Sequence, residues 1–124
     1  LSPILKRIFP DVDESSNAFQ AMALNISANL IGIGNAATPF GLRAMAELQK
    51  NNLKKDTATD SMVIFVVMNT ASMQLIPATI GFLRDSYGSK EPFSIIPCVI
   101  ICSFCALCVA LLLAKGLNRV KSWK

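Results

Sequence analysis

The chain contains no histidine, and only 16% of its 124 residues are charged. A soluble domain carries about a quarter charged residues, so this composition favours a membrane protein. Without histidine the chain lacks the commonest general base and the commonest metal ligand. Its acidic residues all lie outside the long apolar runs, and no paired carboxylates or nucleophile–base arrangement is visible. We therefore expect no catalytic residue, no metal, no cofactor and no enzyme activity.

Long uncharged runs dominate what is present. Residues 62–83 and 93–114 each contain 22 positions without a charge. As helices they would reach about 33 Å, enough to cross a hydrocarbon core of about 30 Å. A third apolar run, 18–34, is shorter and contains polar residues. The sequence thus predicts an all-α integral membrane fold, with two full transmembrane helices and a broken helical segment over 17–49 that either re-enters or crosses the membrane.

The broken segment combines amides with helix-breaking residues. Its helix is expected from about residue 17 to Gly32, followed by a break. Thr38 caps well and Pro39 is tolerated at a first helical position, so the helix should restart there and run to about residue 49. Amides and freed backbone groups at membrane depth both need partners. The combination predicts irregular backbone that lines a polar cavity. The polar residues concerned are Asn25, Asn29, Asn35 and Thr38, and the break involves Gly32, Gly34 and Pro39.

The run 62–83 has a polar interruption of its own. Asn69, Thr70 and Gln74 precede Pro77, where the missing N–H should kink the helix. Two interrupted helices are a sequence indication of a transporter-like site. We expect the two interruptions to face each other, with these residues joining the first set in a substrate-binding or gating constriction. The alternative is that the amides hold helices together, at around 0.6 kcal/mol for each interaction.

Basic residues set the expected topology. Lys115, Arg119, Lys121 and Lys124 follow the last run, so residues 115–124 are expected to form a cytoplasmic tail. A nucleic-acid partner is not predicted, because the adjacent span accounts for these charges. If the segment 17–49 enters the membrane and returns to the same side, ten of the 12 basic residues lie on the cytoplasmic side. If the segment crosses the membrane, eight do. The rule therefore favours re-entry, with residues 1–16 as an interfacial segment.

Four cysteines superficially match a cluster-binding spacing. Cys98, Cys102, Cys105 and Cys108 lie on one stripe of a continuous apolar run. A straight helix cannot fold four ligands round one cluster, so we expect a packing or lipid-facing role.

Two motifs carry a family resemblance: GNAATP at 34–39, and NT-x-S-x-x-LIP at 69–77. With them the chain resembles the spore maturation protein A family of nucleoside-recognition, or Gate, domain membrane proteins, over nearly its whole length. The resemblance implies a bacterial inner-membrane protein acting in spore core dehydration, and a single partial Gate domain over 1–124, since relatives begin further upstream. It also implies a permease- or gate-like component for an unknown small solute.

The alternative to that role is a non-transporting assembly or scaffold subunit for a partner Gate protein. The partners that the resemblance implies are membrane lipid and either a spore maturation protein B-like protein or a second copy of the chain.

Overall fold

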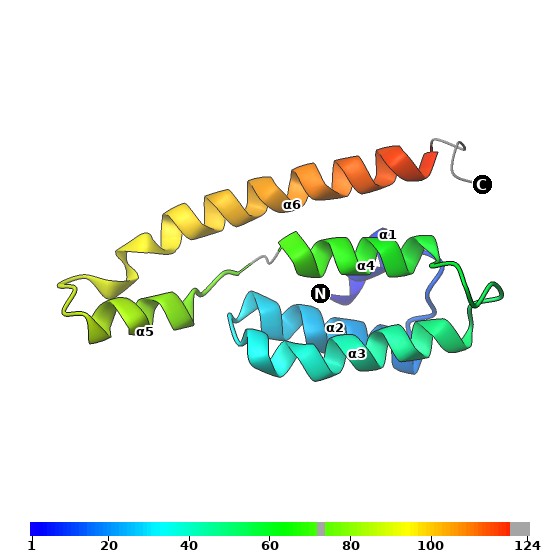
Figure 1. The fold of residues 1–124 in the computed structure, drawn as a ribbon, viewed down its shortest axis with the longest axis horizontal. Helices are drawn as coiled ribbons and strands as arrows, with labels where there is room; N and C mark the ends of the chain where they lie inside the picture. The colour runs from blue at the N-terminus through cyan, green and yellow to red at the C-terminus, as the bar shows by residue number, and fades with distance from the viewer. Residues whose placement is uncertain (72–73, 120–124) are drawn as a thin grey trace.

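The computed structural model describes residues 1–71 and 74–119, and every regular element within them is helical. This confirms the all-α class. The elements in chain order are α1 (Ser2–Ile8), α2 (Asn17–Leu30), α3 (Gly34–Lys50), α4 (Asp60–Ala71), α5 (Ala78–Ser86), the 3-10 helix η1 (Pro92–Ile95) and α6 (Ile96–Arg119) (Figure 1).

Helices α2 and α3 form an antiparallel hairpin (Figure 1). The hydroxyl of Ser16 caps α2 by accepting the N–H of Phe19 at 3.1 Å. The helix restarts at Gly34 and not at Pro39, which corrects the expected cap at Thr38. Gly32, with φ +80°, reverses the chain within a short turn, so helical geometry resumes at once. Pro39 is tolerated inside α3 because the carbonyl it leaves without a partner belongs to exposed backbone early in the helix.

The hydrophobic core lies between α1, α2, α3 and α4. Residues 1–16 contribute to it through Leu5, Phe9 and Val12, which are all buried. The rings of Phe9 and Phe65 pack edge to face, with centroids 6.5 Å apart. The expected interfacial segment is therefore also a packed part of the bundle, although Leu1 and Ile4 remain exposed.

The second expected full span is interrupted. Helix α4 has 12 residues, so it rises only about 18 Å, and α5 begins after Pro77. The N–H groups of Leu75 and Ile76 donate to the carbonyl of Leu30 and not to a preceding turn, and proline has no N–H to give. A continuous transmembrane helix over 62–83 is therefore wrong. Ser72 and Met73 lie outside the described residues.

Within the described part of the chain, one helical stretch, Pro92–Gly116, is long and apolar enough to cross a membrane. Its 25 residues correspond to about 37 Å of helix. It runs beside α4 (Figure 1). No residue in its most apolar stretch is buried. The four cysteines are free thiols on this helix, with Cys108 half-buried and the others exposed. Helix α6 continues through Lys115 into the expected tail, whereas Lys121 and Lys124 lie outside the described residues.

Candidate functional site

The two interruptions meet directly, backbone against backbone. We call this contact the junction; it joins the turn 30–34 to the linker 74–77. The carbonyl of Leu30 accepts the N–H groups of Leu75 and Ile76, at 2.8 and 3.4 Å. A Cβ built on Gly32 would lie 2.1 Å from the carbonyl oxygen of Ile76, so only glycine permits this approach. The structure therefore brings the two broken helices together.

Beside the junction lies an open depression of about 550 Å³, which we call the junction hollow. Three uncharged polar side chains line it, those of Asn35, Gln74 and Thr79. The rest of the lining is apolar or glycine, and no ionisable group takes part. Such a lining suits a neutral polar molecule better than an ion, because a charge in apolar surroundings needs a partner.

A second depression, the amide groove, lies between the hairpin and α4 and measures about 370 Å³. Asn25 is its most buried polar residue, with 2% of its surface exposed. Its Nδ2 donates to the carbonyl of Ala37 at 2.9 Å, which ties α2 to α3. Gly41 makes room for this amide, since a Cβ there would lie 2.9 Å from Nδ2. The full lining is Asn25, Thr38, Gly41, Leu42, Met45, Phe65, Val66, Asn69 and Thr70.

Asn69 connects α4 to the hairpin. Its Oδ1 accepts a hydrogen bond from Nδ2 of Asn29 at 3.0 Å, and its own Nδ2 donates to the carbonyl of Phe65 at 2.9 Å. The hydroxyl of Thr70 likewise donates to a carbonyl one turn back, that of Val66, at 2.9 Å. Amides on α2 and α4 therefore do act as a link between helices.

Most of the site residues predicted from sequence line one or the other of these two depressions. Asn35 and Gln74 line the junction hollow, whereas Asn25, Thr38, Asn69 and Thr70 line the amide groove. Asn29 does not line the groove; it lines a separate small hollow, of about 40 Å³, beside Asn69 and Leu107. The residues expected in a single constriction therefore line separate depressions. This separation could not be foreseen because Asn69 and Gln74 fall on opposite sides of the break in 62–83.

The predicted helix-break residues differ in their structural roles. Gly32 forms the close contact with the linker, and Pro77 is buried immediately before α5. A Cβ on Gly34 would meet nothing within 4 Å. Pro39 lies inside α3 and breaks nothing. The turn is therefore made by Gly32 and not by the proline.

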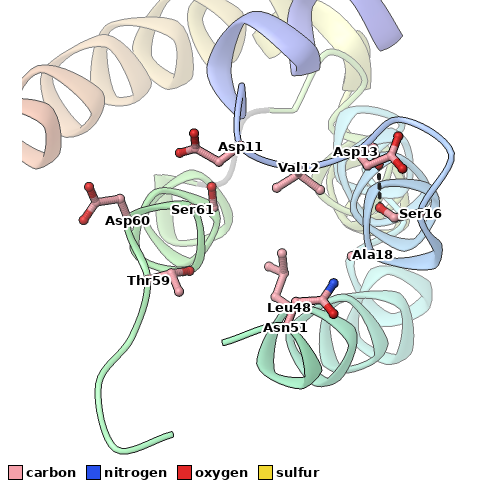
Figure 2. Close-up of a pocket in the computed structure, with 10 residues that line it drawn as sticks. All are labelled: Asp11, Val12, Asp13, Ser16, Ala18, Leu48, Asn51, Thr59, Asp60 and Ser61. Atoms are coloured by element: carbon pink, nitrogen blue, oxygen red, sulfur yellow. Dashed lines mark hydrogen bonds between the residues drawn. The ribbon is translucent and has the colours of Figure 1, made fainter. Parts of the chain in front are cut away.

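Sequence reasoning missed a third depression, at the opposite end of the hairpin. Figure 2 shows Asp11, Asp60 and Ser61 on one side of it and Asp13 with Ser16 on the other. The backbone N–H of Ser15, and then its hydroxyl, lower the pKa of the Asp13 carboxyl by hydrogen bonding to the charged form. The sequence feature that could have indicated this depression is the recurrence of aspartates near the starts of two helices. Within residues 1–71 and 74–119 no three His, Cys, Asp or Glu side chains gather to hold a metal ion.

The junction hollow and the amide groove both lie within the region that matches known proteins. A family model described as nucleoside recognition (Gate) matches residues 1–86, from α1 to the end of α5. Spore maturation protein A of Bacillus subtilis (strain 168) is 38% identical over 94 residues, which are 76% of this chain and 48% of that protein. The chain thus spans about half the length of this curated relative. No solved structure matches the chain.

Proposed function

Because the chain belongs to the spore maturation protein A family of nucleoside-recognition (Gate) domains, we propose that it is a gate- or permease-like membrane component that passes a small polar solute. The setting that we propose is the bacterial inner membrane, with small-solute movement or spore core dehydration as its task. The observation that carries the proposal is the junction between two interrupted helices.

The junction has the features of a structure that can separate. Two backbone hydrogen bonds to Leu30 and one close contact at Gly32 join the turn to the linker. Irregular backbone at membrane depth is tolerated where it is buried in protein or lines a cavity, and transporter sites are typically built from such discontinuous helices. Parting the turn from the linker would expose backbone groups to the junction hollow. In this proposal Asn35 and Gln74 contact the solute as it passes.

Charge placement supports an orientation for this gate. Arg7, Asp60 and Lys115 line one hollow at the end where α3 connects to α4 and where α6 ends (Figure 1). Arg84 and Lys90 lie towards the opposite end, where Arg84 bonds to Ser89 and Ser94 in the α5–α6 connection. We propose that the first end is cytoplasmic, with α2 and α3 as a re-entrant hairpin in a multi-pass protein.

A second candidate is an assembly subunit for a spore maturation protein B-like partner or for another copy of the chain. The observation that favours it is that Asn25, Asn29 and Asn69 all form hydrogen bonds that tie helices together. In that case the polar residues stabilise the subunit, and the apolar face of α6 lies against lipid or a partner helix. No solute passes.

Replacing the polar residues of the junction hollow distinguishes the two functions. We expect Asn35→Leu and Gln74→Leu to lower solute permeability several-fold. The hollow would lose the polar side chains that hydrogen-bond a solute in place of water. Stopped-flow light scattering of proteoliposomes measures the permeability to water and glycerol. Asn17→Leu, at an exposed position at the start of α2, is the matched control.

Unchanged permeability, together with loss of co-purification with the partner, would contradict the gate and support assembly. A second measurement needs no flux. In a background with the four native cysteines replaced by alanine, Asn35→Cys and Gln74→Cys should react with a membrane-impermeant thiol reagent. Phe104→Cys, on the outward face of α6, should react slowly. Failure of both hollow positions to react would exclude an aqueous cavity.

A further inference from the structure

We propose that the amide groove is a binding site for a small uncharged solute, held through the hydrogen-bond donors of that solute. This proposal rests on the proposed function in one respect: the solute bound in the groove would be the one that passes the junction. Binding itself can be measured without flux, so the two ideas fail separately.

The first observation is a buried acceptor without a partner. Oδ1 of Asn25 has less than 1 Å² exposed and receives no hydrogen bond from any residue that the structure describes. Exchanging the oxygen and nitrogen of the amide does not help, because Nδ2 already donates to the Ala37 carbonyl. A buried unpaired acceptor costs on the order of 1–3 kcal/mol. A donor that arrives from the groove would recover part of that free energy.

The second observation concerns the two threonines of the groove. The hydroxyl of Thr38 donates to the carbonyl of Gly34 at 3.4 Å, and that of Thr70 donates to Val66. A hydroxyl has a single O–H, so while these bonds are kept both oxygens accept from a ligand. Asn25, whose Oδ1 lacks a partner, lines the same groove as both threonines. In this proposal the ligand presents O–H or N–H groups to these oxygens.

The third observation is the absence of charge in the lining. Leu42, Met45, Phe65 and Val66 supply the apolar wall, and none of the nine lining residues is ionisable. An ion would lose its hydration without gaining a counter-charge, which is costly in apolar surroundings. A neutral solute that carries hydroxyl or amide groups avoids that cost, and its carbon skeleton can lie against the apolar wall.

Binding to the purified full chain in lipid nanodiscs tests the site. The probes are ribose, glycerol and acetamide, with ribose 5-phosphate and sodium chloride as charged comparisons, and calorimetric titration is the readout. We expect at least one neutral probe to bind and the charged comparisons to bind more weakly. The Thr38→Val, Thr70→Val double variant should weaken neutral binding about tenfold, which is the loss expected for about 1.4 kcal/mol. Valine preserves the shape of threonine, so the helices should be retained.

Thr57→Val, in the exposed loop before α4, is the control and should bind as the unmodified chain does. Asn25→Leu should abolish binding, and circular dichroism checks that this variant folds. The site is overturned if no neutral probe binds, if the double variant binds unchanged, or if a charged comparison binds more tightly. Should binding follow the expectation while Asn35→Leu leaves permeability unaltered, the groove stands and the gate fails.

Discussion

At the scale of single residues, Gly32 decides whether the two interruptions can meet. Its φ of +80° and the 2.1 Å approach of a built Cβ to the Ile76 carbonyl both require the absence of a side chain. Gly34, two positions on, satisfies neither condition. Two neighbouring glycines that look alike in sequence therefore have different structural importance.

Gly32→Ala should destabilise the protein by about 1–3 kcal/mol, because the new Cβ is strained at positive φ and displaces the linker. Thermal unfolding in detergent, followed by circular dichroism, measures the change. Gly34→Ala is the control and should be neutral or slightly stabilising, since alanine favours helix and meets nothing. Equal losses for the two variants would contradict the close contact at Gly32.

Asn25 and Asn29 lie four residues apart on α2 but bond to different helices. A spacing of four residues places two side chains on one face of a helix. The structure instead turns Asn25 towards Ala37 on α3 and Asn29 towards Asn69 on α4. Helix spacing does not determine the hydrogen-bond partner, because the partner depends on how the hairpin folds back.

At the scale of elements, both interruptions were visible in the sequence, whereas the lengths of the helices on either side of them were not. Polar residues and Pro77 indicated a kink in 62–83, yet the structure replaces the span by a short α4, a non-helical linker and α5. The linker is stabilised by bonds to Leu30, a contact distant along the chain. Local helix propensity cannot reveal that competition, since the alternative partner is tertiary.

The bond between Asn29 and Asn69 should contribute modestly to holding α4 against the hairpin. Asn29→Ala and Asn69→Ala, made singly and together, should give a coupling free energy of around 0.6 kcal/mol. Unfolding titration in mixed detergent measures all three variants. The pair Asn29 and Thr70, which share no hydrogen bond in the structure, serves as the control cycle. A coupling near zero for Asn29 and Asn69 would contradict the link.

At the scale of the whole molecule, basic residues gather towards one end. The α3–α4 connection, which contains Lys54 and Lys55, and the end of α6 near Lys115 lie together, and α5 lies at the other end (Figure 1). In the proposed orientation this end is the cytoplasmic one. This arrangement arises because α2 and α3 are antiparallel and bring the chain back to the end where it began.

Thiol labelling in intact cells tests the orientation. In the background without native cysteines, Lys54→Cys should be protected from an impermeant reagent, whereas Lys90→Cys should react, because positive charge is retained on the cytoplasmic side. Permeabilised cells, in which both positions should react, supply the control. Reaction at position 54 before permeabilisation would overturn the orientation.

The sequence by itself determined the helical class, the long apolar helix and the family, because composition, run length and motifs are local properties. It also indicated which residues are polar in apolar surroundings. Tertiary structure alone decided that α4 stops short, that Gly32 and not Pro39 makes the turn, and that the polar residues form two depressions. Each of these depends on a contact between residues far apart in the chain, where a carbonyl of one broken helix takes the N–H groups of another.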